Sequence, residues 1–152
     1  FMAQPSKKDH IAASALPLFF EYGIKGTSVD MVVKTSKVSK PTVYNHFPDK
    51  GALFLHVVQI WLDDQPTPKI CPPSGMSILD HLELTWLNDD ALKLYALIIG
   101  EGYRAPEAAQ LFKQQYDSAW RLCAEQWADS NGELKTELLE KVSHHLVLKL
   151  MA

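Results

Sequence analysis

Polar side chains suited to contacting DNA gather between residues 37 and 46 of this 152-residue chain. Their spacing places apolar residues on one side of a helical pattern and hydrogen-bond donors on the other. Proteins use such donors to reach the phosphate oxygens and base edges of a duplex. The outward-facing set is Lys37, Ser39, Lys40, Thr42, Tyr44, Asn45 and His46. This segment is therefore the first candidate for a nucleic-acid surface.

Two short predicted helices position these donors. The first runs roughly from Ser28 to Thr35, and Thr27 and Asp30 have the spacing of a capping box. After a tight turn, the second runs from about Lys40 to Asn45, with Ser39 as its N-cap and a proline in its first turn. Such a pair of helices is typical of a helix-turn-helix. The apolar residues expected to pack it are Val29, Val32, Val33, Val38, Val43 and Phe47.

The flanks of this pair add two candidate contacts. The N-terminal amides of the helix at Ser28 are suited to a phosphate, and Lys50 offers a further charge at the start of the next helix. An alternative is that the segment forms two surface helices with a solvated polar face. Tyr44 would then belong to the core and His46 would be a packed surface histidine, so the pattern alone leaves both interpretations open.

The remaining sequence also has helical periodicity, which predicts an all-α fold. The apolar stripe from Ser6 to Tyr22 continues across Pro17, so we expect one kinked helix there, ended by Gly23. Asp49 caps a linking helix over about residues 50–64, and the stretch Pro66–Gly75 is the one clear linker. Further helices are predicted at about Ser77–Leu87, Asp89–Gly102, Pro106–Asp129 and Glu133–Met151.

These elements predict two domains. Residues 2–50 form a three-helix helix-turn-helix domain, and residues 51–152 form a helical domain for effector binding and dimerisation. The last predicted helix stops without a cap or a helix breaker, which suggests that the sequence is incomplete at its C-terminus.

Charge and composition narrow the function classes. Residues 1–50 carry seven lysines and four acidic residues, whereas the remainder carries 8 basic and 14 acidic residues. A basic N-terminal part and an acidic remainder favour contact of the N-terminal part alone with a polyanion, although chance would also give so small a difference.

The apolar runs are too short for a membrane span, so no membrane partner is expected. The two cysteines provide neither a disulfide framework nor a zinc spacing and suit a cytoplasmic protein.

Enzyme activity is not expected. No triad, Cys/His pair, paired carboxylates or Gly-rich phosphate loop stands out, and we expect no cofactor. The neighbouring histidines His144 and His145 point about 100° apart on a helix and cannot chelate one ion together, so no metal site is expected.

The motif residues resemble the N-terminal domain of the TetR family of bacterial transcriptional regulators. The resemblance rests on Thr27-Ser28-Val29, on the run from Val38 to Leu53 that includes Thr42-Val43-Tyr44-Asn45-His46-Phe47, and on Phe19-Phe20-Glu21-Tyr22-Gly23. A weaker similarity covers Glu101, Arg104, Pro106-Glu107 and Leu111-Phe112.

Three positions depart from the family pattern. Lys37 stands where glycine is usual in the turn, and a left-handed backbone there would cost a lysine about 1 kcal/mol. Pro41 replaces a small residue and donates no amide to phosphate. Gly51 replaces an acidic helix former. The first two departures leave the base preference open.

The resemblance implies specific roles. Ser28, Tyr44, His46 and Lys50 would hold phosphates, while Lys40, Pro41 and Thr42 would lie against base edges, with Ser39 as a cap and contact. It also implies an effector pocket and a dimer formed by the last two helices. Core packing is the alternative for each aromatic of the C-terminal half. The pocket candidates are Trp61, Trp86, Tyr95, Ile99, Tyr103 and Tyr116, and the interface candidates are Phe112, Trp120, Trp127, His144 and Leu148.

The sequence thus predicts a DNA-binding transcriptional regulator. We expect a repressor that binds a palindromic operator on double-stranded DNA as a homodimer and that a small-molecule effector releases. Two related recognition helices read half-sites about 34–36 Å apart, which favours the dimer. The alternatives are a helical small-molecule-binding or dimerisation module without operator binding, and a small helical enzyme. The latter predicts a buried polar cluster in the C-terminal half.

Overall fold

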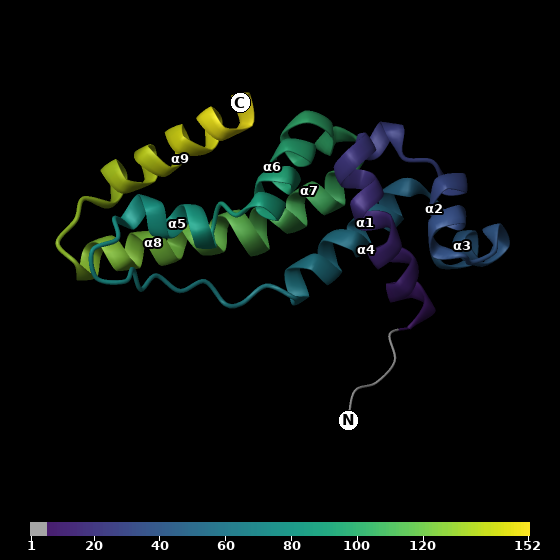
Figure 1. Ribbon diagram of the computed structural model, residues 1–152, viewed down its shortest axis with the longest axis horizontal. Coiled ribbons are helices and arrows are strands. Elements are labelled where there is room, and N and C mark those ends of the chain that lie inside the picture. The colour runs from purple at the N-terminus through teal and green to yellow at the C-terminus, as the bar shows by residue number, and fades with distance from the viewer. Residues whose placement is uncertain (1–5) are drawn as a thin grey trace. The chain divides into compact units, whose positions relative to one another are not determined.

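A computed structural model describes residues 6–152 and contains helices and no strand in that range (Figure 1). The predicted all-α fold class is confirmed. The chain divides into two compact units. The first contains the described residues up to Gln65 together with Leu97–Phe112, and the second contains Pro66–Ala96 with Lys113–Ala152. The predicted boundary between residues 50 and 51 stays a prediction. The first unit extends past it to Gln65 and also includes a segment from the second half of the sequence.

The first unit is built from helices of both segments. From the N-terminal segment come α1 (Lys7–Gly26), α2 (Val29–Ser36), α3 (Lys40–His46) and α4 (Lys50–Asp63). The later segment adds the end of α6 (Asp89–Glu101), the 3-10 turn η1 (Gly102–Arg104) and α7 (Pro106–Phe112). The bounds of α2, α3 and α4 lie within about one residue of the predicted ones.

Apolar side chains of α1, α4 and α7 form the core of the first unit. Phe19 and Phe54 are fully buried and meet edge to face, with ring centroids 5.0 Å apart. Two turns further along α4, Trp61 lies against Phe112 of α7, with centroids 6.2 Å apart. Each buried aromatic side chain of this kind stabilises a fold by about 1.5–3 kcal/mol. The helices α2 and α3 pack against α1, which this core holds in place.

The backbone of α1 breaks at Gly23 and not at Pro17. Gly23 has φ 77° and ψ 179°, whereas the torsion angles stay helical through Pro17. The predicted single helix through the proline is therefore present, but its interruption lies one turn and a half later, at the glycine predicted to end it. A short turn, Ile24–Gly26, follows before α2 begins.

The second unit contains α5 (Ile78–Thr85), the start of α6 (Asp89–Glu101), α8 (Ser118–Ser130) and α9 (Lys135–Met151). The single helix predicted over residues 106–129 is divided by the π-helical turn η2 (Lys113–Asp117). The predicted linker from residue 66 to 75 lacks helix. Within the described range, no helix is both long and apolar enough to span a bilayer.

A partly buried hydrogen-bond network joins the α5–α6 region, the π-helical turn and α8 in the second unit. The Trp86 indole donates to the Tyr95 hydroxyl at 2.9 Å, and that hydroxyl donates to Asp117 at 2.7 Å. Arg121 donates to both carboxylate oxygens of Asp117, at 3.0 and 3.2 Å. Burial, followed by the neighbouring Asp117, raises the pKa of Tyr95, so its hydroxyl stays a donor. Tyr116 donates to the Trp86 carbonyl from the π-helical turn.

Candidate nucleic-acid interface

The N-terminus of α2 is capped by Ser28. Its hydroxyl oxygen accepts from the Met31 amide at 3.2 Å, and the Met31 sulfur accepts the Ser28 amide at 3.4 Å. The predicted Thr27–Asp30 capping box is therefore wrong by one residue. Thr27 is buried and its hydroxyl lies within hydrogen-bond distance of the Leu18 and Gly23 carbonyls, at 3.1 and 2.8 Å. The Thr27 hydroxyl therefore binds the end of α1. The exposed Ser28, and not Thr27, caps α2.

The turn between α2 and α3 has a left-handed residue at Lys37. Its backbone has φ 59° and ψ 27°, and its amide donates to the Val33 carbonyl at 2.9 Å. Among the described non-glycine residues, it alone has a positive φ. The left-handed conformation expected at this position is thus present, although it is sterically unfavourable for a lysine.

Ser39 is the N-cap of α3, as predicted. Its oxygen accepts the Thr42 amide at 3.4 Å and lies 2.8 Å from the Thr42 hydroxyl. Pro41 lies in the first turn, where its missing amide leaves no helical bond unmade. Val32, Val43 and Phe47 are buried and pack the two helices onto the core, while Val29, Val33 and Val38 are half-buried.

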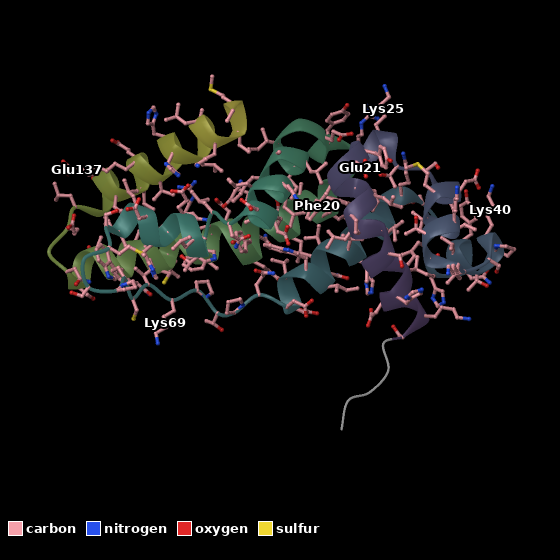
Figure 2. The ribbon with its side chains drawn as sticks, in the orientation of Figure 1. Phe20, Glu21, Lys25, Lys40, Lys69 and Glu137 are labelled. Atoms are coloured by element: carbon pink, nitrogen blue, oxygen red, sulfur yellow. The ribbon has the colours of Figure 1, made fainter. Side chains whose placement is uncertain are left out.

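The side chains predicted to meet DNA lie on α3, in the turn before it and at the start of α2, and most of them are exposed. Figure 2 labels Lys40 among them. Tyr44 is 44% exposed, which places it outside the core. Thr42 and His46 are half-buried. We call this set the reading surface: Ser28, Lys37, Ser39, Lys40, Pro41, Thr42, Tyr44, Asn45 and His46. The structure brings these residues together, and their contacts with DNA stay a prediction.

An ion pair joins Lys40 of the reading surface to α2. The Lys40 ammonium lies 2.9 Å from the carboxylate of Asp30 in α2, and both side chains are more than half exposed. The hydrogen bond with Asp30 raises the pKa of Lys40, which keeps this lysine charged. An exposed pair of this kind contributes little to stability, so the lysine can exchange its carboxylate for a phosphate at little cost.

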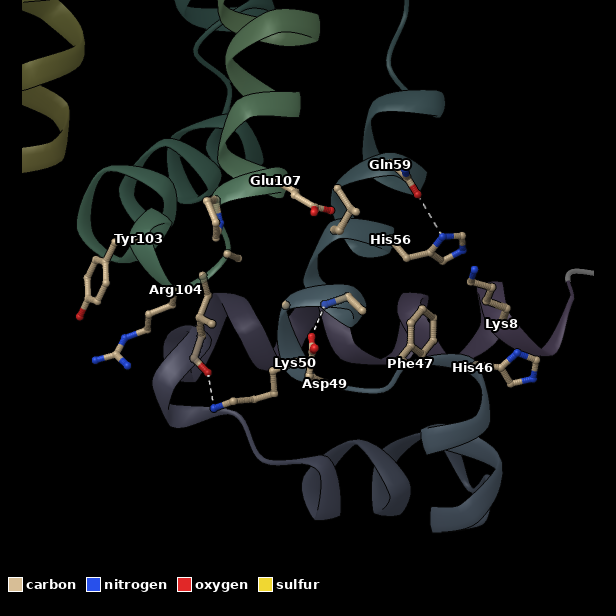
Figure 3. A pocket seen from close by; sticks show the side chains of 16 residues that line it. Lys8, His46, Phe47, Asp49, Lys50, His56, Gln59, Tyr103, Arg104 and Glu107 are labelled. Atoms are coloured by element: carbon tan, nitrogen blue, oxygen red, sulfur yellow. Dashed lines mark hydrogen bonds between the residues drawn. The ribbon is translucent and has the colours of Figure 1, made fainter.

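Lys50 has protein partners. Its ammonium donates to the carbonyls of Ile24 at 2.9 Å and Lys25 at 3.2 Å, and Figure 3 shows its side chain extended toward the end of α1. The resemblance implied a phosphate contact for this residue. In the structure, the lysine closes the turn after Gly23, a role that its sequence position did not suggest.

Two histidines fix α1 to the neighbouring helices. The His10 ring nitrogen lies 2.8 Å from the Ser36 carbonyl at the end of α2. The His56 ring of α4 lies 2.7 Å from the Asp9 carboxylate, and this hydrogen bond lowers the pKa of Asp9. Neither histidine was predicted from sequence, because each acts on a residue distant along the chain.

A groove of about 1070 Å³ lies on the first unit, between the α3–α4 turn, α4 and the start of α7 (Figure 3). Phe47, Leu55 and Pro106 supply apolar lining, and Lys8 and Glu107 supply charge. Among the six predicted pocket residues, only Tyr103 lines this groove. Ile99 and Tyr103 are 67% and 72% exposed.

The other predicted pocket residues are buried. Trp61 is 5% exposed and belongs to the core of the first unit. Trp86, Tyr95 and Tyr116 share the network of the second unit, together with Asp117 and Arg121, which sequence reasoning missed. The i, i+4 spacing of Asp117 and Arg121 was the only sequence signal of the ion pair that they form.

The predicted interface residues fall into two groups. Phe112 and Trp120 are 1% and 5% exposed, so they are core residues of their own units and are not available to a partner. Trp127 is half-buried, His144 is exposed and Leu148 is 52% exposed. Val147 and Met151 lie near Leu148 on α9 and are also exposed, so an apolar face remains open there.

Comparisons with known proteins agree with this geometry. Residues 11–57 match the family described as bacterial regulatory proteins, tetR family. Over 158 residues, the chain is 26% identical to the HTH-type transcriptional regulator UidR of Escherichia coli strain K12, covering 97% of this chain and 79% of that protein. The structure of Salmonella enterica GusR covers 96% of this chain and 82% of its own, with a TM-score of 0.66 and 23% identity. The flavonoid-responsive regulator FrrA covers 82% of this chain and 67% of its own, with a TM-score of 0.58 and 28% identity.

Proposed function

Because this chain belongs to the TetR family and is a DNA-binding transcriptional regulator, we propose that it is a repressor that binds a palindromic operator as a homodimer. In this proposal it acts in the bacterial cytoplasm, and a small-molecule effector releases it from DNA. The observation that carries the proposal is the reading surface: capped helices hold a row of exposed donors on α3 and its turn. Phosphate contacts from this row make the affinity salt-dependent.

Effector release has separate support. FrrA is described as flavonoid-responsive. In this chain, the second unit holds an aromatic network in which Tyr95, Tyr116 and Asp117 supply polar groups, the combination that small-molecule sites use for orientation. An effector must bind one conformation better than another to shift binding to DNA. We propose that these side chains contribute to that difference.

DNA binding is tested with duplexes that the wild-type protein selects from a random pool. Lys40→Ala removes a cation at the exposed end of α3, so we expect weaker binding and a decrease of about one in the slope of log affinity against log salt. Lys69→Ala is the matched control, since Lys69 is an exposed lysine of the linker segment (Figure 2). Equal affinities for the two variants would contradict the assigned surface.

The alternative of a helical binding or dimerisation module without operator binding makes the opposite prediction. It expects that no duplex is enriched from the pool at any salt concentration. Thermal shifts with a panel of small molecules that includes a flavonoid then test the effector separately. A ligand that raises the melting temperature but leaves DNA affinity unchanged would refute release by that ligand.

A further inference from the structure

The carboxylate of Glu101 lies on the turn that joins α1 to α2. One of its oxygens accepts the Ile24 amide at 3.1 Å, and the other accepts the Lys25 amide at 2.9 Å. The Glu101 side chain is 26% exposed. A carboxylate that receives two backbone amides makes charge-assisted hydrogen bonds, about twice as strong as neutral ones. Glu101 therefore binds this turn from the end of α6, 76 residues away along the chain.

Gly23 makes this contact feasible. Its φ of 77° interrupts α1 directly before the two residues whose amides donate to Glu101. A Cβ at this position would collide with the nearer Glu101 oxygen. The glycine is thus required by its backbone conformation and also by the approach of the carboxylate.

The other side of the same turn is held by Lys50, whose ammonium binds the Ile24 and Lys25 carbonyls. Glu101 therefore binds the amides, and Lys50 the carbonyls, of the same two residues. Arg104, three residues further along the chain, lies 3.7 Å from Glu101, a longer distance than the bonds to the amides. The turn is tied to two helices other than its own.

The turn leads directly into the reading surface. Thr27 follows it and binds back to the Gly23 carbonyl, and Ser28 then caps α2. The position of Ser28 and of the helix pair after it consequently depends on where the turn is held. Glu101 itself is distant from the reading surface in sequence and has no part in it.

We propose that Glu101 is a positioning residue for DNA binding, which fixes the turn after Gly23 and thereby orders the reading surface. This inference rests on the proposed function, since it concerns the affinity for an operator. Without the carboxylate, the turn samples other positions, and DNA must order it on binding. The expected consequence is a loss of affinity without the loss of a phosphate contact.

The test compares Glu101→Gln and Glu101→Ala with the wild-type chain on duplexes that the wild type selects. Glu107→Gln, an exposed carboxylate of α7 in the same unit, is the matched control. For both Glu101 variants we expect about tenfold weaker binding, the effect of losing one charged hydrogen bond. The slope of log affinity against log salt stays unchanged, which separates positioning from contact with DNA.

Amide hydrogen exchange gives a readout independent of DNA. The Ile24 and Lys25 amides should exchange about tenfold faster in the Glu101 variants, at a temperature where every variant is folded, and as in the wild type for Glu107→Gln. Unchanged exchange or unchanged affinity would overturn the inference. If the wild-type chain selects no duplex while exchange still responds to Glu101, the failure belongs to the proposed function and the positioning role for DNA is withdrawn with it.

A double-mutant cycle tests the contact with Gly23. Gly23→Ala introduces both backbone strain and a collision with the carboxylate, whereas in a Glu101→Ala background only the strain remains. We expect the effect of Gly23→Ala on DNA affinity to be about threefold smaller in that background. Additive effects would show that the carboxylate does not approach Gly23 in solution and would overturn the assignment.

Discussion

At the scale of single residues, Lys37 shows a local conflict between backbone and sequence. The α2–α3 turn requires a left-handed residue, and glycine adopts that conformation without steric cost, while lysine does not. The lysine adds a charge beside the proposed DNA surface. We interpret this position as one where binding to a polyanion and stability of the fold make opposite demands.

Substitution of Lys37 separates these two demands. Lys37→Gly should raise the free energy of unfolding by about 1 kcal/mol, because it relieves the left-handed strain. The same change should weaken DNA binding and lower the salt slope by about one, because a cation is lost. Urea denaturation and titration of a selected duplex measure the two effects. Lys37→Ala is the control: it removes the charge but keeps the strain, so a stability gain in this variant would refute the conformational argument.

At the scale of elements, the caps and helix starts followed from local sequence, whereas long-range contacts did not. Ser39 and Asp49 cap α3 and α4 as predicted, because an N-cap acts on an amide three residues away. Thr27 has the right residue type for a cap, but its hydroxyl binds the carbonyls of α1. Local spacing cannot distinguish these outcomes, since the choice depends on the burial of Thr27.

The π-helical turn is a second case where tertiary structure decides. Periodicity predicted one helix from 106 to 129, yet Tyr116 and Asp117 both bind residues of the α5–α6 region. Adjacent side chains on an α-helix point about 100° apart, so a wider turn is needed for both to reach one side. The roles of Lys50 and Glu101 also could not be predicted, because each binds backbone groups far away in sequence.

The link between α1 and α4 predicts a pH dependence. The hydrogen bond with His56 holds the pKa of Asp9 below its ordinary value of 3.8. A lowered folded-state pKa contributes stability that is present above the unfolded value and is lost as the pH falls through the folded value. Asp9→Asn should therefore cost about 0.5 kcal/mol at pH 6, a magnitude typical of partly exposed pairs, and progressively less below pH about 4.

Denaturation midpoints between pH 6 and pH 3 measure the difference in stability between the wild type and Asp9→Asn. Asp63→Asn, which changes an exposed carboxylate at the end of α4, should follow the wild type at every pH. A gap between wild type and Asp9→Asn that widens toward low pH would contradict the assignment of the His56–Asp9 pair.

At the scale of the whole molecule, the basic residues and the exposed apolar face of α9 lie in different halves of the sequence. The lysine-rich first fifty residues carry the reading surface, and the acidic remainder carries α9 with its exposed apolar side chains. A single recognition helix reads few base pairs, so a repressor with operator specificity needs a second copy. The open face near Leu148 is the surface we assign to that copy.

Leu148→Lys tests this assignment. Leu148 is 52% exposed, so a lysine there leaves the fold of one chain intact but places a charge in the proposed interface. We expect sedimentation to report a mass near the 17.1 kDa of one chain for this variant, and the mass of a dimer for the wild type. The affinity for a two-site duplex should fall by at least tenfold, because the second contact is no longer intramolecular. Leu84→Lys, at a 68% exposed leucine of α5, is the matched control and should remain dimeric. A Leu148→Lys variant that is dimeric and binds the duplex like the wild type would place the interface elsewhere.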